Sequence, residues 1–150
     1  MATVRLPPDF KEFLQLLNSH KVEYLLIGGY AVGYYGYPRA TADLDIWIST
    51  SPMNAAKVVK ALQGFGFGVE ALDPDLFLKA EQIIRMGMPP LRIEILTTIS
   101  GVIFEECYAA RKIDKLDGVE VALIGFDHLK MNKKASGRHK DLNDLEHLLG

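Results

Sequence analysis

The sequence contains a single cysteine, Cys107, so an internal disulfide and a cysteine-rich zinc site are both excluded. Long apolar runs are also missing. The longest uncharged stretch, residues 24–38, is rich in glycine and shorter than the roughly 18 apolar residues that a membrane span needs. The first ten residues lack the apolar core of a signal peptide, so we expect a cytoplasmic protein without a membrane partner.

No excess of one charge is present either. Lys and Arg total 17 against 19 Asp and Glu, which gives a formal net charge of −2 and excludes a broad nucleic-acid clamp. The 150 residues, of which 49% are hydrophobic, fit one globular domain over 1–150. The charge is nevertheless unevenly distributed. Residues 128–140 contain no acid and several basic residues, which are Lys130, Lys133, Lys134, Arg138 and Lys140. One nucleotide could therefore lie between this basic run and acids elsewhere in the chain.

Several catalytic signatures are absent as well. No Gly-Lys-Ser/Thr follows a glycine-rich loop, and the glycines at 64–68 do not match the dinucleotide-binding pattern. A Gly-x-Ser-x-Gly elbow is missing, and Cys107 has no histidine near it in sequence, so covalent nucleophilic catalysis is poorly supported. The histidines lack metal-binding spacing, so we expect them to be surface or capping residues.

Apolar periodicity and turn residues predict an interleaved series of elements. We expect helices at 9–19, 30–35, 52–62 and 102–111, strands at 22–27, 43–48, 81–86, 91–96 and 119–124, and a helical segment at 127–150. The strands at 81–86 and 91–96 should form a hairpin, and Asp117-Gly118 should form a turn. This order predicts an α+β domain in which helices cover a small mixed sheet and the C-terminal segment packs on it.

Local signals set the expected helix boundaries. Asp9 and Glu12 have capping-box spacing, with Asp in place of the usual Ser or Thr. Ser51-Pro52 should begin the third helix, which should run through Leu62, and the glycine-rich stretch 64–68 should supply its C-terminal stop and a turn. The C-terminal segment should break near Ser136-Gly137 and finish with a stripe of leucines at 142, 145 and 149.

The first chemical candidate is the alternation at 43–48. It places Asp43 and Asp45 on one strand face, with their Cα atoms roughly 6.5 to 7 Å apart. Two negative charges about 4 Å apart repel by about 4 kcal/mol at an effective dielectric of 20, so a half-buried pair requires a counter-charge. Mg²⁺ would supply it, as would Arg39 or Arg92, and a merely solvated strand face remains the alternative.

A third acid and a glycine pair extend this candidate. Glu94 lies between Ile93 and Ile95 on a predicted strand, and by itself it is an exposed strand residue. If its strand pairs beside 43–48, three acids share one face and can hold two divalent ions. Gly28-Gly29, at a strand-to-helix junction, either forms a tight turn or lets a phosphate approach the backbone.

The basic run is the last candidate. Lys130, Lys134, Arg138 and Asp141 recur at near-helical spacing, so several of them could point toward one phosphate-bearing ligand. The alternative is a basic helix face that contacts only solvent.

The order of these features resembles a known superfamily. Gly28-Gly29, then Asp43-x-Asp45, then Glu94 on a later strand, together with GRHKDLNDLEHLL near the end, is similar to nucleotidyltransferases typified by DNA polymerase beta. The likeness extends from about Phe10 to Leu148. It is nearest to the small prokaryotic nucleotidyltransferases related to abortive-infection toxins and minimal nucleotidyltransferases, and it implies a polymerase beta palm-like fold.

The resemblance also implies a site. Asp43, Asp45 and Glu94 would be the catalytic carboxylates and the ligands of two Mg²⁺ ions, with Glu94 as the base toward the acceptor hydroxyl. The nucleotide-binding residues would be Gly28, Gly29, Arg39, Thr41, Lys133 and Arg138. Two features depart from the pattern: Tyr30 follows the glycine pair where a serine is usual, and the third acid is Glu where Asp is usual.

The implied function is a Mg²⁺-dependent transfer of a nucleoside monophosphate from an NTP such as ATP to an acceptor hydroxyl. The acceptor would be RNA or tRNA, a protein, or a small hydroxylated molecule. The alternative is a catalytically silent module that binds a nucleotide or a partner protein, as one half of a toxin–antitoxin pair. A third reading is an ion-pair network that binds no ligand.

Overall fold

The computed structural model describes residues 4–38, 40–66, 72–87 and 91–149. Its sheet has six strands in the order β3-β4-β2-β1-β6-β5. The strands are β1 (Tyr24–Ile27), β2 (Asp43–Ile48), β3 (Ile83–Met86), β4 (Arg92–Leu96), β5 (Lys112–Leu116) and β6 (Val119–Leu123). The helices are α1 (Pro8–Ser19), α2 (Gly28–Tyr34), α3 (Pro52–Phe65), α4 (Phe104–Ala109), α5 (Phe126–Ser136) and α6 (His139–Leu149), with a 3₁₀ turn η2 (Pro74–Phe77).

Parallel and antiparallel pairs both occur in this sheet. The β3–β4 and β5–β6 hairpins are antiparallel, as is β1–β2, whereas β2–β4 and β1–β6 are parallel. The expected α+β architecture, a mixed sheet covered by helices, is therefore confirmed. Within the described ranges, no helix is long and apolar enough to cross a membrane.

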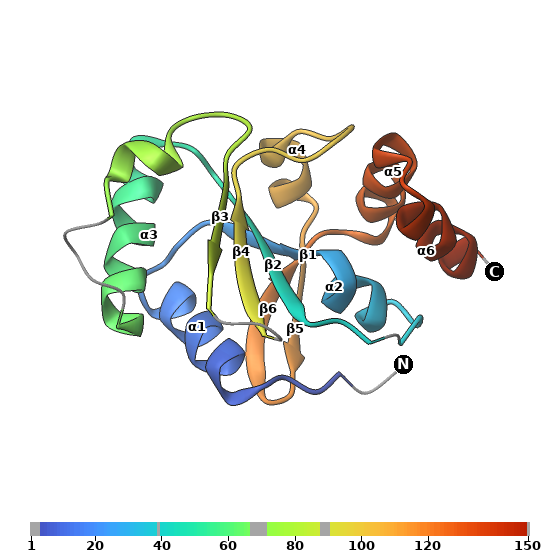
Figure 1. Ribbon diagram of the computed structural model, residues 1–150, viewed down its shortest axis with the longest axis horizontal. Helices are drawn as coiled ribbons and strands as arrows, with labels where there is room; N and C mark the ends of the chain where they lie inside the picture. Colours follow the sequence, from blue (N-terminus) through green and yellow to red (C-terminus); the bar gives the residue numbers. More distant parts are fainter. Residues whose placement is uncertain (1–3, 39, 67–71, 88–90, 150) are drawn as a thin grey trace.

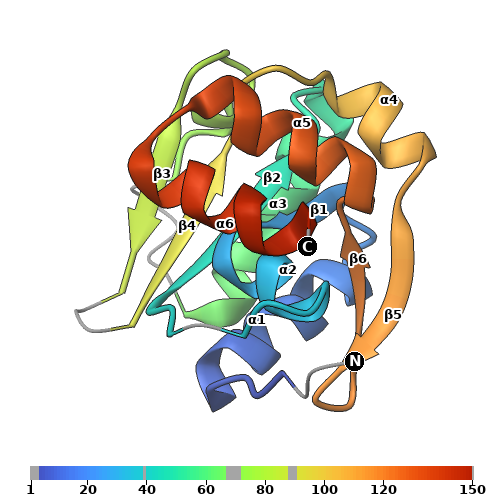
Figure 2. The ribbon, with the colours of Figure 1, turned by 90° about the vertical axis from the view of Figure 1, so that its right-hand side faces the viewer.

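Each face of the sheet has its own core. Leu44, Ile46 and Ile48 of β2 pack with α1 and α3 on one face. Trp47 packs on the other face with residues of β1, α2, α4 and α5. Figures 1 and 2 show α5 and α6 on the side of the sheet opposite α1 and α3. Because side chains alternate along a strand, Asp43 and Asp45 share the Trp47 face, beneath α5 and α6.

The first helix begins differently from the expectation. Its N-cap is Pro7 and no side chain caps it, so the capping box of Asp9 and Glu12 is wrong. Pro8 follows at the first helical position, which suits proline because the first turn needs no backbone N–H there. Asp9 instead lies in the first turn, where a negative charge is favourable.

The third helix begins as expected but ends later. The hydroxyl of Ser51 accepts a hydrogen bond from the Asn54 amide at 3.2 Å. The helix runs past Leu62 to Phe65, and its C-cap is Gly66 of the predicted stop, whose φ of 100° only glycine adopts easily. A Cβ at Gly64 would lie 3.1 Å from Leu16 Cδ2, so Gly64 permits close packing of α1 on α3 instead of stopping the helix.

One strand was not expected. β5 pairs with β6 across a tight turn in which Asp117 and Gly118 have φ values of 49° and 85°. Its sequence, KIDKL, is mostly exposed, because an edge strand needs little apolar surface and its charges oppose edge-to-edge association. The backbone pairing with β6 therefore decides the structure of this segment.

The C-terminal helices are separated at the predicted place. Gly137, with φ of 69°, ends α5 before α6 begins. The leucine stripe does not form the buried face of α6, however, since Leu142 and Leu149 are 46% and 66% exposed. The buried residues of α6 are instead two acids, Asp141 and Asp144.

Candidate functional site

The pairing of β2 with β4 brings the three predicted acids to one place. In the parallel register Asp45 lies opposite Glu94 and Asp43 lies opposite Arg92. All three carboxylates line a cavity of about 400 Å³ between the sheet and the α5–α6 pair. The conditional expectation that the Glu94 strand pairs beside the Asp43 strand is thus confirmed.

Asp45 has the most perturbed environment of the three. Burial, together with the neighbouring Glu94 and Asp43 carboxylates, raises its pKa to about 7. Lys140, from α6, opposes this effect. Asp45 Oδ1 and Asp43 Oδ1 are both buried and accept no hydrogen bond from the described residues. A buried acceptor without a partner is costly, so these two oxygens suit a cation.

Two arginines approach the acids. Arg85 Nε donates to Glu94 Oε1 at 3.0 Å. Arg92 Nε lies 3.5 Å from Asp43 Oδ1, close enough for charge attraction but without the alignment of a hydrogen bond. Considering only the described parts of the chain, no group of three His, Cys, Asp or Glu side chains has the arrangement of a metal site. The assignment of Asp43, Asp45 and Glu94 as metal ligands therefore stays a prediction.

The glycine pair is required by the packing of the site. Gly28 has φ of 70°, and a Cβ there would lie 2.1 Å from Asp45 Oδ2. A Cβ at Gly29 would lie 2.7 Å from Thr41 Oγ1, which itself donates to the Asp43 carbonyl oxygen at 3.3 Å. Both glycines line the acidic cavity. The predicted site residue Arg39 lies outside the described residues.

The opposite wall of the cavity carries a buried ion cluster. Lys133 is only 4% exposed, and its Nζ lies 3.1 Å from Asp141 Oδ1 and 3.1 Å from Asp144 Oδ2. Arg138 Nε donates to Asp141 Oδ2 at 2.6 Å. Lys133 and Arg138 thus both line the cavity, as expected of nucleotide-binding residues, but their nearest partners are aspartates of α6.

The basic stripe read from the spacing does not exist as one surface. Arg138 and Asp141 line the acidic cavity, whereas Lys130 and Lys134 line a separate apolar groove of about 430 Å³ with Leu145. Lys130 Nζ lies 4.3 Å from the centre of the Phe126 ring. The stripe fails because Gly137 ends α5, so helical spacing does not continue into α6.

Sequence reasoning missed three charged participants. Arg85 pairs with Glu94, Asp144 pairs with Lys133, and Lys140 acts on Asp45 across the cavity. The Arg85 contact could have been found from the hairpin register, because Arg85 lies directly opposite Glu94. The roles of Asp144 and Lys140 depend on how α6 folds back, for which the sequence carries no local signal. The histidines agree with the expected surface role, because none of them is buried. The ring of His147 stacks on the ring of Tyr37, with 3.8 Å between the ring centres.

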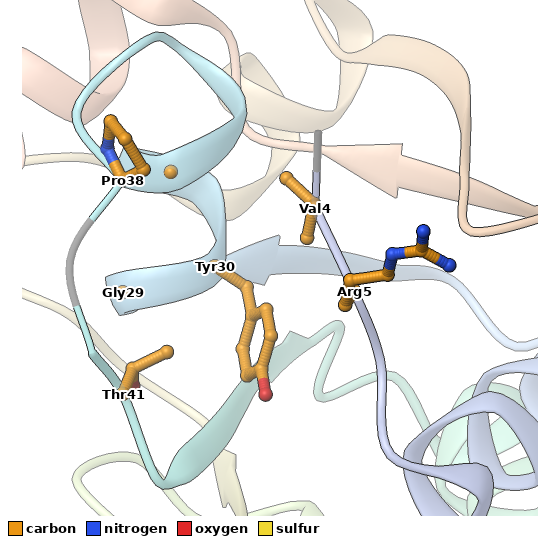
Figure 3. Close-up of a pocket in the computed structure, with 7 residues that line it drawn as sticks. Val4, Arg5, Gly29, Tyr30, Pro38 and Thr41 are labelled. Atoms are coloured by element: carbon orange, nitrogen blue, oxygen red, sulfur yellow. The ribbon is translucent and has the colours of Figure 1, made fainter. Parts of the chain in front are cut away.

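A second, smaller cavity of about 170 Å³ lies behind the glycine pair. Figure 3 shows its lining, with the Tyr30 ring between Thr41 and Arg5. Tyr30 is 7% exposed, and burial raises the pKa of its phenol. Gly29 and Thr41 therefore border this cavity, and Gly29 also borders the acidic one.

Comparison with known proteins gives similarity in structure but not in sequence. No protein-family model and no curated protein sequence matches the chain. A lincosamide antibiotic adenylyltransferase, LnuA, solved with lincomycin bound, is similar over 99% of this chain and 99% of its own, with 15% identity and a TM-score of 0.58. A proposed nucleotidyltransferase from Thermotoga maritima is similar over 97% of this chain and 96% of its own, with 13% identity and a TM-score of 0.63. The fold expected from the resemblance is thus confirmed as the nucleotidyltransferase fold.

Proposed function

We propose that this protein is a nucleotidyltransferase that moves a nucleoside monophosphate from an NTP to an acceptor hydroxyl and releases pyrophosphate. The observation that carries the proposal is the register of β2 and β4, which places Asp45 opposite Glu94 with Asp43 on the same face. The nucleotidyltransferase fold supports it, although a fold alone does not determine an activity.

Magnesium is the cofactor that suits the three carboxylates. Asp43, Asp45 and Glu94 provide only oxygen donors, which Mg²⁺ prefers, and two of these oxygens are buried without a hydrogen-bond partner among the described residues. When bound, a pair of Mg²⁺ ions would neutralise phosphate charge and polarise the α-phosphate. The side chains of Arg85 and Arg92 would then turn from the carboxylates toward the anionic substrate.

The transfer itself needs positioning and one proton acceptor. The acceptor oxygen forms a bond to the α-phosphorus while the bond from that phosphorus to the β-phosphate bridging oxygen breaks, and the released group is pyrophosphate. The Glu94 carboxylate takes the proton of the acceptor hydroxyl. Gly28 and Gly29 let the triphosphate approach the backbone, and Thr41, Arg138 and Lys140 provide groups that can contact it.

The acceptor classes are RNA, a protein and a small hydroxylated molecule. The similar LnuA is an adenylyltransferase of a lincosamide antibiotic, which supports ATP as the donor and a small molecule as the acceptor. The lining of the acidic cavity also favours a small acceptor. Lys130 and Lys134 line a different groove, so they do not extend the cavity into a basic surface that could bind RNA.

The test uses α-labelled NTPs with Mg²⁺ and three acceptor pools: total RNA, cell protein and small hydroxylated compounds. We expect label transfer from ATP that is lost in Asp43→Ala with folding intact. Glu120→Gln is the matched control, because Glu120 is an exposed acid on β6 of the same sheet, and it should transfer like the unmodified protein. Transfer that persists in Asp43→Ala, or no transfer to any pool, would contradict the proposal.

A second candidate is a catalytically silent module that binds a nucleotide or a partner protein of a toxin–antitoxin pair. The Arg85–Glu94 contact favours it, because an arginine can balance an acid without a metal ion. Calorimetry separates the two functions. An enzyme should bind NTP more tightly with Mg²⁺ and lose that gain in Asp45→Asn, whereas a silent module should be indifferent to both changes.

A further inference from the structure

The ion cluster between α5 and α6 is unusual in how completely it is enclosed. Lys133, Asp141 and Asp144 are 4%, 1% and 0% exposed. Charged groups are rarely buried to this extent unless each is held by a partner of opposite sign. The contacts within the cluster therefore have a defined geometry.

Asp141 is at the centre of this geometry. Its Oδ1 lies 3.1 Å from Lys133 Nζ, and its Oδ2 accepts from Ser136 Oγ at 2.5 Å and from Arg138 Nε at 2.6 Å. These donors hold the pKa of the Asp141 carboxyl well below its usual range. Asp141 therefore remains a carboxylate at neutral pH and keeps all of these contacts.

Arg138 is held along one edge only. Nε and Nη2 both donate to Asp141, at 2.6 and 3.3 Å, while the side chain is 72% exposed. A guanidinium has five N–H donors, so three remain for a ligand. Arg138 lines the same cavity as Asp45 and Glu94, and the charges of these two acids contribute to raising its pKa.

The cluster has no net charge to offer a nucleotide. Lys133 and Arg138 are balanced by Asp141 and Asp144, so its effect on an anionic ligand depends on which donors face the cavity. An unrestrained arginine side chain populates many rotamers, and part of that conformational entropy is lost on binding a phosphate. Holding the guanidinium in advance reduces that loss.

We propose that Asp141 is a positioning residue that holds the Arg138 guanidinium toward the triphosphate, and that Lys133 is its buried counter-ion instead of a nucleotide ligand. This inference rests on the proposed function. It assigns the nucleotide contact to the outer edge of Arg138 and the support of that contact to Asp141, Ser136 and Lys133.

A double-mutant cycle tests the inference, with the dissociation constant of an ATP analogue carrying a non-cleavable α,β-bridge as the readout. Asp141→Asn and Arg138→Ala should each weaken binding about tenfold, equivalent to about 1.4 kcal/mol. Adding Asp141→Asn to Arg138→Ala should produce no further loss, because Asp141 acts through Arg138. Additive losses would overturn the inference.

Asp144→Asn is the matched control. It removes another buried aspartate that contacts Lys133, while Arg138 keeps its two hydrogen bonds to Asp141, so analogue binding should stay within twofold of the unmodified protein. An equal tenfold loss in Asp144→Asn would mean that the cluster only maintains the fold, and it would overturn the inference.

A second variant covers the case in which Asp141→Asn does not fold. Arg138→Lys keeps the charge on an exposed side chain but cannot present the same two-donor edge to Asp141, so it should also weaken binding about tenfold. Binding by Arg138→Lys equal to the unmodified protein would overturn the inference. No analogue binding by the unmodified protein would instead overturn the proposed function together with this inference.

Discussion

The two helix pairs that cover the sheet are held in opposite ways. On one face, α1 and α3 bury mainly apolar side chains, including Phe10, Phe13, Leu14, Leu17, Val58 and Leu62. On the other face, where Figure 2 shows α5 and α6, the α6 helix buries two aspartates against Lys133 of α5, and its leucines at 142 and 149 are exposed.

The two faces therefore differ in what their contacts contribute: one mainly stabilises the domain, and the other mainly orients charged side chains. Apolar burial is non-directional, contributes about 25 cal/mol per Å², and tolerates small shifts. A buried ion cluster gives little net stability, because desolvation offsets the attraction, but it fails when one partner is removed or displaced. The α1–α3 face therefore supports the domain, and the α5–α6 face orients charged groups above the acids.

The largest effect should come from the apolar face. Phe13→Ala removes a fully buried ring that packs edge-to-face on Phe65 at 5.3 Å, so the free energy of unfolding should fall by about 4 kcal/mol. Urea titration followed by circular dichroism measures this loss. A loss under about 1 kcal/mol would show that α1 is not the main support of the sheet.

A somewhat smaller effect should follow from breaking the ion cluster. Lys133→Met removes the ammonium group between Asp141 and Asp144, at a cost of about 3 kcal/mol at pH 7. The low pKa of Asp141 means that its stabilising contribution is present above the unfolded value of 3.8 and is lost as pH falls below it. The difference between the two proteins in urea titration should therefore shrink toward pH 3. A pH-independent difference would contradict the ionic account.

Removing a charge from the acidic cavity should have the opposite sign. The native pKa of Asp45, about 7, lies above the unfolded value of 3.8, so the native state binds more protons and stability falls as pH rises between them. In EDTA at pH 8, Asp45→Asn should raise the free energy of unfolding by about 2 kcal/mol. Thermal melts at pH 4 and pH 8 provide the check, since the gain should nearly vanish at pH 4. A destabilised variant would favour an ion-pair network that binds no ligand.

The smallest effect should come from the exposed leucines. Leu142→Gln changes a side chain that is 46% exposed, so stability should change by less than about 0.5 kcal/mol. Leu17→Gln on the fully buried face of α1 is the contrasting variant, and it should lower the free energy of unfolding by about 3 kcal/mol. Comparable melting temperatures for the two variants would remove the contrast between the helix pairs.

Much of the sheet and the acidic strand could be predicted because their signals are local. Alternation over 43–48 defines both the strand and the shared face of Asp43 and Asp45, and the structure has this strand with the same bounds. The edge strand β5 could not be recognised, because its pairing with β6 matters more than its own composition. The predicted capping box of Asp9 and Glu12 is absent because the helix starts earlier, with Pro7 as its N-cap, so Asp9 already lies inside the first turn.

The sequence by itself determined which groups are available: three acids at strand positions, two glycines at a strand end, and a basic run interrupted by Gly137. Only the tertiary structure decided which of them meet. Parallel pairing placed Asp45 opposite Glu94, and the reversal at Gly137 turned Arg138 and Asp141 toward them while Lys130 and Lys134 went elsewhere. The physical reason is that charge interactions depend on distance and burial in space, which chain spacing fixes within one strand or helix but not between them.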